Sequence, residues 1–173
     1  MDALDDSALL AECEVDTYRA SGPGGQNRNK VESAVRLRHK PTGISVIAEE
    51  SRSQAENRAR ALRRLRKALA LRVRHPVEPE GVPDAVRACI DPASPAGRRD
   101  GRLRVGLRDR RYLPAAGAVL DLLHALDGSV SATAARLGLS TGNLSGFLTA
   151  DADLLAEANR LRAGFGLRPL RRD

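Results

Sequence analysis

Alternation of apolar and polar side chains predicts a small β-sheet in the first third of the chain. Residues 13–19 alternate as a half-buried strand does, and residues 34–40 alternate again. A Pro-Thr-Gly turn follows, and residues 44–48 return, so we expect residues 34–48 to form a hairpin. The residues expected to share the inner side of these strands are Cys13, Val15, Thr17, Val35 and Leu37.

Helical periodicity replaces the alternation from Ser53 onward. Ser53 and Glu56 have the spacing of a capping box, in which each side chain accepts a backbone N–H of the other's turn. The apolar positions expected to pack on the sheet are Ala55, Ala59, Leu62, Leu65 and Leu69. Short helical turns are also expected at residues 5–10 and 29–33.

The second half of the chain predicts a helical bundle. Residues 75–95 contain five prolines and indicate a linker with a short helix at 85–89, and residues 103–107 suggest a brief strand. Further helices are expected at 115–126, with Pro114 in the first position, at 131–148 as a helix-turn-helix pattern, and at 153–163. The predicted domains are residues 1–74, a linker at 75–113 and a bundle at 114–173, in an α+β fold with one basic helix packed on the small sheet.

The charge balance favours an anionic partner. The chain has 29 lysines and arginines against 22 acidic residues, a net charge of +7, and only three of the basic residues are lysines. Arginine matches phosphate geometry better than lysine does. Aromatic residues make up 2% of the chain, which argues against a single-strand binder that stacks bases on rings.

The predicted helix after Ser53 carries arginines on every exposed face and a single Glu56. Such a helix repels itself unless it meets a polyanion, so a phosphate-contacting role is favoured over a solvated face. Arginines on the outer face of the hairpin are equally compatible with solvent or RNA. A second basic run at residues 98–111 is either solvated or an RNA-contacting arm.

Metal, cofactor and membrane functions find no support. Cys13 and Cys89 are far apart, and the three histidines are scattered, so no ligand spacing for a metal is present and no cofactor is expected. There is no signal-peptide pattern and no run of membrane-spanning length, so a cytoplasmic protein is expected. The predicted helix at 140–149 has no Arg or Lys, which favours a packing or docking role over DNA readout.

Ser21–Lys30 is the stretch with the most unusual composition. Three glycines surround Pro23, so neither a helix nor a regular strand is expected, and the backbone is open to close approach by another molecule. Gln26 follows the last glycine, with polar and basic residues after it. An ordinary turn is the alternative. The spacing fits neither a dinucleotide fingerprint nor a phosphate-binding loop.

Four motifs in order resemble the catalytic domain of peptide-chain release factors, over about residues 10–71. They are Arg19-Ala20-Ser21-Gly22-Pro23-Gly24-Gly25-Gln26, Asn29-Lys30-Val31-Glu32-Ser33-Ala34-Val35, Pro41-Thr42-Gly43-Ile44, and Arg52-Ser53-Gln54 with Asn57-Arg58.

The resemblance implies hydrolysis of the peptidyl-tRNA ester in the peptidyl-transferase centre of the large ribosomal subunit. Gly24 and Gly25 would admit the backbone, the Gln26 N–H would stabilise the reacting group, and the Gln26 side chain would position water. A glutamine methyltransferase acting on Gln26 is a further implied partner. The residues expected to contact RNA or the ribosome are Arg19, Asn27, Arg28, Asn29, Lys30, Arg52, Gln54, Arg58, Arg63 and Lys67.

The chain also departs from the release-factor pattern. Asn27-Arg28 stands where the family often has His-Val, no stretch is expected to read stop codons, and the basic tail at 160–172 is short. The resemblance is therefore greatest to codon-independent proteins that free peptides from stalled ribosomes or split large subunits. A non-catalytic ribosome- or RNA-binding module is the main alternative, and a DNA-binding regulator is a weaker one.

Overall fold

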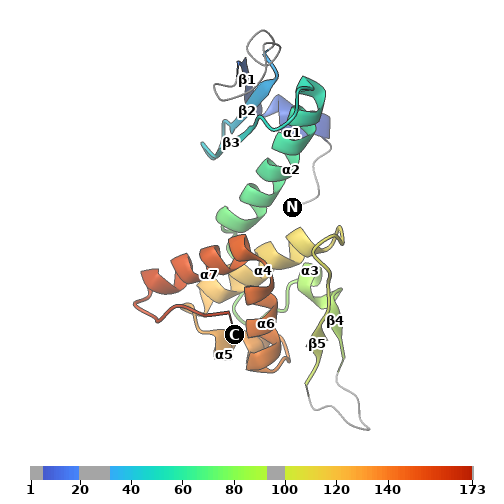
Figure 1. Ribbon diagram of the computed structural model, residues 1–173. Helices are drawn as coiled ribbons and strands as arrows, with labels where there is room; N and C mark the ends of the chain where they lie inside the picture. Colours follow the sequence, from blue (N-terminus) through green and yellow to red (C-terminus); the bar gives the residue numbers. More distant parts are fainter. Residues whose placement is uncertain (1–5, 20–31, 93–99, 173) are drawn as a thin grey trace. The chain divides into compact units, whose positions relative to one another are not determined.

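A computed structural model describes residues 6–19, 32–92 and 100–172 (Figure 1). The fold is α+β, as predicted, and the chain divides into two units, residues 1–69 and 70–173. Within the described ranges, no helix combines the length and the apolar character that crossing a membrane requires.

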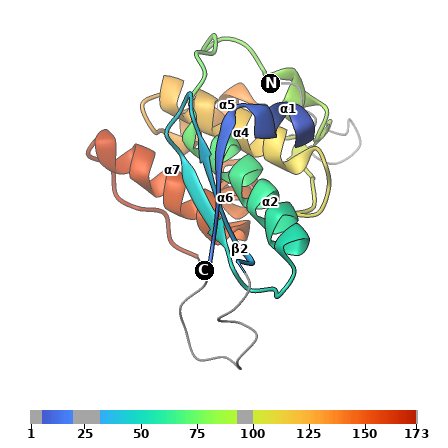
Figure 2. The ribbon, with the colours of Figure 1, turned by 90° about the horizontal axis from the view of Figure 1, so that it is seen from above.

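Unit 1 is a three-stranded antiparallel sheet with two helices. Its elements are α1 (Asp6–Ala11), β1 (Cys13–Tyr18), β2 (Ala34–His39), β3 (Ser45–Ala48) and α2 (Gln54–Arg72), whose last residues belong to unit 2. The strand order is β1-β2-β3, so β2 is central and the predicted hairpin is confirmed. Figures 1 and 2 show α2 running along the sheet.

The inner face of the sheet is formed mainly by β2. Val35 and Leu37 are buried, as predicted, and their neighbours Arg36 and Arg38 face outward. The expectation for β1 is wrong in part: Cys13 is buried, but Val15 is 42% exposed and Thr17 is exposed as well. Because β1 is an edge strand with one neighbouring strand, much of its inner side stays open.

The buried stripe of α2 differs from the one predicted. Leu62, Leu65 and Leu69 are buried, but Ala55 and Ala59 are exposed. The buried residues that precede Leu62 are Asn57 and Ala61. Positions 57, 61 and 65 follow each other at four-residue spacing and share one face. A count of apolar residues passes over Asn57 because its side chain is polar.

The start of α2 has half of the predicted capping box. The Ser53 hydroxyl accepts the Glu56 N–H over 3.3 Å, which satisfies one free donor of the first turn. The Ser53 N–H donates to the Ser51 hydroxyl over 3.0 Å instead of to Glu56. The short helix expected at 29–33 is absent at Glu32 and Ser33, and its other residues lie outside the described ranges.

Unit 2 is built around one apolar helix. Its elements are α3 (Asp84–Arg87), β4 (Ile90–Asp91), β5 (Arg102–Leu103), α4 (Tyr112–Ala125), α5 (Val130–Arg136), α6 (Thr141–Ala150) and α7 (Ala152–Gly164). Val119, Leu120, Leu122 and Leu123 of α4 are fully buried. The helix begins at Tyr112, so Pro114 is its third residue rather than its first; there its missing N–H has no intrahelical partner to lose.

Other segments of unit 2 pack against α4. Val86, Cys89 and Leu103 join the core cluster, so the described part of the proline-rich stretch contributes to it. Between α5 and α6, Gly138 has a φ of +66°, a value that glycine adopts without strain. Ser129 and Ser140 cap these two helices, each by accepting a backbone N–H over 3.2 Å.

A buried ion pair fixes the residues that follow α2 onto α4. Arg74 lies 2.8 Å from Asp121, and its guanidinium also donates to the carbonyls of Ala70 and Leu71. The His75 N–H donates to Asp121 over 3.0 Å. Burial raises the pKa of Asp121 and lowers the pKa of Arg74, since both charges are partly removed from water. Loss of one partner would leave the other charge uncompensated.

Close packing beside this pair gives a stability prediction. A Cβ at Gly117 in α4 would lie 2.8 Å from the Ala70 carbonyl oxygen, whereas a Cβ at Gly146 in α6 would meet no atom within 4 Å. Gly117→Ala should lower the free energy of unfolding by about 1–3 kcal/mol. Gly146→Ala should raise it by about 0.5–1 kcal/mol through helix propensity. Urea unfolding of both variants tests this, and a Gly117→Ala protein as stable as Gly146→Ala would contradict it.

Candidate functional site

The candidate site is the segment that joins β1 to β2. Ser21–Lys30 lies outside the described residues, and with it lie the predicted residues Gly24, Gly25, Gln26, Asn27, Arg28, Asn29 and Lys30. The two ends of the segment are described. Tyr18 at the end of β1 is the register partner of Ala34 at the start of β2. The segment therefore leaves and re-enters the sheet at one end, between two adjacent strands.

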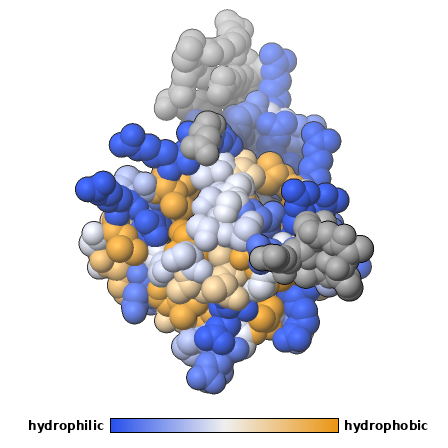
Figure 3. All heavy atoms as spheres, turned by 90° about the horizontal axis from the view of Figure 1, so that it is seen from below, coloured by the Kyte–Doolittle hydropathy of each residue, from blue (hydrophilic) through white to orange (hydrophobic). Residues whose placement is uncertain are grey.

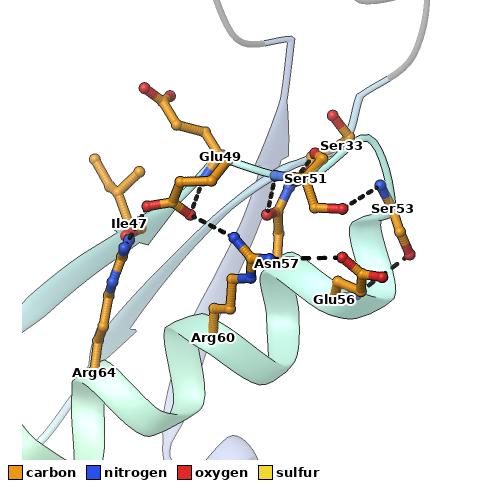
Figure 4. Close-up of polar contacts among 10 residues, drawn as sticks. Ser33, Ile47, Glu49, Ser51, Ser53, Glu56, Asn57, Arg60 and Arg64 are labelled. Atoms are coloured by element: carbon orange, nitrogen blue, oxygen red, sulfur yellow. Dashed lines mark hydrogen bonds and ion pairs between the residues drawn. The ribbon is translucent and has the colours of Figure 1, made fainter.

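Two amide side chains from the start of α2 hold the returning end. The Gln54 amide donates to the Glu32 carbonyl over 3.1 Å. The Asn57 amide donates to the Ser33 carbonyl over 2.7 Å and to the Ser51 carbonyl over 2.8 Å, and its oxygen accepts the Ser51 N–H over 3.0 Å. Figure 4 shows Asn57 between Ser33 and Ser51.

The sequence does not predict Asn57 as a site residue. Asn57 belongs to one of the four motifs, but its polar side chain is not expected in the core. Its exposed fraction is 0%. The available signal was helical spacing, since Asn57 precedes Ala61 and Leu65 by four and eight positions on the buried face.

Arg19 and Glu32 form an ion pair across the two ends of the segment. The Arg19 Nε lies 3.9 Å from the Glu32 carboxylate, and both side chains are more than half exposed. An exposed pair at this distance contributes little to stability. The pair places the predicted RNA-contacting Arg19 at the base of the segment. Gln54 is also predicted to contact the ribosome, but its side-chain amide nitrogen donates to the Glu32 carbonyl of this chain.

The arginines on the outer face of the sheet are paired across strands. Arg36 lies 2.7 Å from Asp16, and Arg38 lies 3.3 Å from Glu14. Each acid is the register partner of its arginine on β1. Opposite charges in such positions stabilise a sheet and leave little net field for RNA. This pairing favours the solvated interpretation of these two arginines.

Part of the basic face of α2 is also neutralised, by acids from outside the helix. Arg64 donates to the Glu50 carboxylate and to the Ile47 carbonyl, and Arg60 lies 3.9 Å from Glu50 (Figure 4). Arg66 lies 2.7 Å from Asp6. The expected repulsion between arginines of this helix is therefore wrong for Arg60, Arg64 and Arg66, because acids from other segments pair with them.

Three of the predicted RNA-contacting arginines are exposed in the part of the chain that the structure describes. Arg52, Arg58 and Arg63 are exposed, and the described residues supply no carboxylate partner to any of them. Lys67, which was also predicted to contact RNA, is half-buried. Arg52, just before α2, and Arg58 and Arg63 on α2 are therefore among the exposed cations available to an anionic partner.

The titratable groups with nucleophilic or metal-binding potential serve the fold. Cys13 and Cys89 donate to the carbonyls of Leu9 and Ala85, and burial raises the pKa of both thiols. A raised pKa keeps a thiol protonated and unreactive. Buried His39 contacts Thr42 over 2.8 Å and Glu12 over 3.0 Å. Over the described ranges, no cluster of three or more potential ligands is placed to hold a metal ion.

Part of the chain is similar to known proteins. Residues 8–82 match the family model described as RF-1 domain. Peptide chain release factor 2 of Paramagnetospirillum magneticum is 55% identical over 65 residues, which are 38% of this chain and 18% of that protein. Peptide chain release factor 1 of Nitrosospira multiformis is 42% identical over 104 residues, which are 60% of this chain and 28% of that protein.

A third relative gives the same picture. Peptide chain release factor 1 of Malacoplasma penetrans is 57% identical over 56 residues, which are 32% of this chain and 16% of that protein. The chain thus spans less than a third of the length of these relatives. The matched domain encloses the segment between β1 and β2 and both amide anchors on α2, whereas most of unit 2 lies beyond residue 82.

The charge contacts beside Asn57 give a pH prediction. Hydrogen bonding from Arg64 lowers the pKa of Glu50 below its ordinary value. A carboxylate with a lowered pKa stabilises the folded state above its unfolded pKa and loses this contribution as pH falls. Because the pair is half exposed, the effect should stay below about 1 kcal/mol.

Chemical unfolding at several pH values tests this contribution. Wild type should lose slightly more stability than Glu50→Gln between about pH 5 and pH 3, because the variant has no carboxylate to protonate. Parallel curves for the two proteins would contradict the assignment.

Proposed function

We propose that this release-factor-like protein hydrolyses the ester bond of peptidyl-tRNA on the ribosome without reading a codon. Its substrates are stalled ribosomes or split large subunits, and its partner is the peptidyl-transferase centre. The main support is the RF-1 domain match, which encloses Gly24-Gly25-Gln26 in a segment whose returning end is hydrogen-bonded to α2.

The proposed chemistry depends on the backbone of Gln26. Water attacks the ester carbonyl, negative charge develops on its oxygen, and the 3′-terminal ribose leaves. A pre-aimed N–H donor lowers such a barrier by about 3–4 kcal/mol. Gly24 and Gly25 have no Cβ to obstruct the approach, and the Gln26 side chain orients the water. The ribosome supplies the remainder of the active site, and a methyltransferase that modifies Gln26 is a further proposed partner.

Codon independence is proposed from the residues outside the RF-1 match. Those beyond residue 82 belong to unit 2, which folds around α4. We assign unit 2, whose described helices pack around a common core, to docking. The guanidinium groups of Arg52, Arg58 and Arg63 have no carboxylate partner among the residues that the structure describes, and they would contact ribosomal RNA phosphates.

A non-catalytic ribosome-binding module is the second candidate. It is favoured by Asn27-Arg28 where release factors often have His-Val, since this change follows directly on Gln26. A DNA-binding regulator finds less support. Asn143, the amide on α6 best suited to read a base, accepts the Leu103 N–H over 2.9 Å, and α6 has no Arg or Lys. Figure 3 shows one face of the molecule, on which pale and hydrophobic residues are mixed and hydrophilic side chains project around the rim.

Substitutions at Gln26 test the backbone mechanism directly. Gln26→Pro removes the proposed N–H donor, so the rate of peptide release should fall about 100- to 1,000-fold. Gln26→Ala keeps the N–H and should lose less. The measurement is release of labelled peptide from stalled ribosomes and from isolated large subunits at saturating protein.

Cosedimentation with the ribosomal particles provides the control for this test. Both variants should bind as wild type does, so that the loss lies in the chemical step. Release that is equally fast with Gln26→Pro and wild type would remove the Gln26 amide from the mechanism. Binding by wild type without any release would favour the non-catalytic module.

Salt dependence tests the proposed phosphate contacts of α2. Arg58→Gln and Arg63→Gln should each reduce the slope of log K against log salt for ribosome binding by about one. Arg36→Gln is the matched control, because Arg36 is exposed but already paired with Asp16 and should leave the slope unchanged. Identical slopes for all three variants would place the RNA contacts elsewhere on the protein.

A further inference from the structure

Asn57 is a polar residue at a position of the kind that apolar side chains usually occupy. It is fully buried on the face of α2 that continues with Ala61 and Leu65. Burying an amide costs free energy unless its donors and acceptor find partners. The hydrogen bonds of Asn57 meet this cost, and they connect segments that the β-ladder does not hold.

The orientation of the Asn57 amide is determined by its partners. Two partners are carbonyls, of Ser33 and Ser51, which can only accept; the third is the Ser51 N–H, which can only donate. One orientation therefore satisfies all three, with the nitrogen toward the carbonyls. Aspartate lacks the two donors, and an aliphatic residue lacks all polar groups, so neither can replace this arrangement.

The carbonyls that α2 binds lie at one place in the chain. Ser33 immediately precedes β2, so its carbonyl lies outside that strand, and Glu32 comes just before it. Gln54 binds the Glu32 carbonyl and Asn57 binds the Ser33 carbonyl. Two amides three residues apart on one helix thus hold two consecutive peptide groups, at the point where the β1–β2 segment returns to the sheet.

The other partner of Asn57 is itself fixed. Ser51 belongs to the connection between β3 and α2, and Asn57 binds both its N–H and its carbonyl. Glu50, next to Ser51, receives hydrogen bonds from Arg64, which also binds the Ile47 carbonyl of β3 (Figure 4). The Asn57 amide that binds the Ser33 carbonyl is therefore itself fixed. It belongs to α2, and it is hydrogen-bonded to the connection between β3 and α2.

We infer that Asn57 is a positioning residue for peptide release, and that Gln54 assists it. By fixing the Ser33 and Glu32 carbonyls, the amides of Asn57 and Gln54 would set the direction in which the chain returns from Gly24-Gly25-Gln26, without touching substrate. This inference rests on the proposed function. Misplacement of a reacting group by about 1 Å can cost up to about 100-fold in rate, so the anchor should act on the chemical step rather than on binding.

The experiment compares two anchor variants with two controls. Asn57→Ala removes the buried amide, and Gln54→Ala removes the exposed one with little risk to folding. Asn159→Ala is the chemical control, because Asn159 in unit 2 makes the same kind of contacts, to the Leu170 carbonyl over 3.0 Å and the Leu170 N–H over 2.7 Å. Leu65→Val is the control for loss of core packing in unit 1.

Two measurements are made on each protein. Peptide release from stalled ribosomes gives kcat and KM, and amide hydrogen exchange of the free protein reports on residues 32–35. Asn57→Ala should lower kcat about 10- to 100-fold, with KM within twofold of wild type, and should speed exchange at 32–35. Gln54→Ala should do the same to a smaller extent. Both controls should keep the wild-type kcat and exchange at 32–35.

The outcomes separate this inference from the function on which it rests. A wild-type protein that releases no peptide would overturn the proposed function. Unchanged exchange at 32–35 in both anchor variants would overturn the anchoring role, whatever the wild type does. Equal loss of kcat in Leu65→Val and Asn57→Ala would reduce Asn57 to a packing residue. If Asn57→Ala does not fold, Gln54→Ala decides between the outcomes by the same two measurements.

Discussion

The hydrogen bonds from α2 to the carbonyls of Glu32 and Ser33 are the constraint on which the candidate site depends. Two antiparallel neighbours fix a connecting segment only at its ends, through the pairing of Tyr18 with Ala34. A backbone mechanism needs a defined position as well as an available N–H. The amides of Gln54 and Asn57 extend the fixed region beyond the β-ladder toward the glycines. The helix is thus both a packing element and an anchor.

The arginines of unit 1 differ in whether an acidic side chain pairs with them. Arginines on the sheet and along part of α2 are paired with acids. Arg52, just before α2, and Arg58 and Arg63 on it have no carboxylate partner within the described ranges. Counting charges along one helix overestimates the field that a partner meets, because Glu50 and Asp6 come from other segments. Arg58 and Arg63 lie on the same helix as the amides of Gln54 and Asn57, and Arg52 lies just before it, so the proposed RNA contact and the proposed positioning would share one element.

Patterns that depend on neighbouring residues were predictable from the sequence. The hairpin, its buried Val35 and Leu37, and the leucine stripe of α2 follow from local periodicity. The predictions of burial are wrong where contacts with distant segments determine whether a side chain is buried. Val15 is exposed because β1 is an edge strand, and Asn57 is buried because carbonyls elsewhere in the chain satisfy its amide. The motif around Gln54 suggested a functional residue, but only the structure shows that its partner is the Glu32 carbonyl.

The roles of the titratable side chains bear on why the position of a backbone N–H would matter in the proposed mechanism. The two thiols are buried with raised pKa values, and His39 is engaged by Glu12 and Thr42, so these groups stabilise the fold rather than offering a nucleophile or base. A backbone amide has no pKa to adjust and no side chain to repack. In the proposed mechanism its only variable is where it lies, and the chain would set that position through the peptide groups of Glu32 and Ser33. A buried asparagine in place of an apolar residue is what such a requirement favours, because hydrogen bonds fix direction whereas apolar contacts do not.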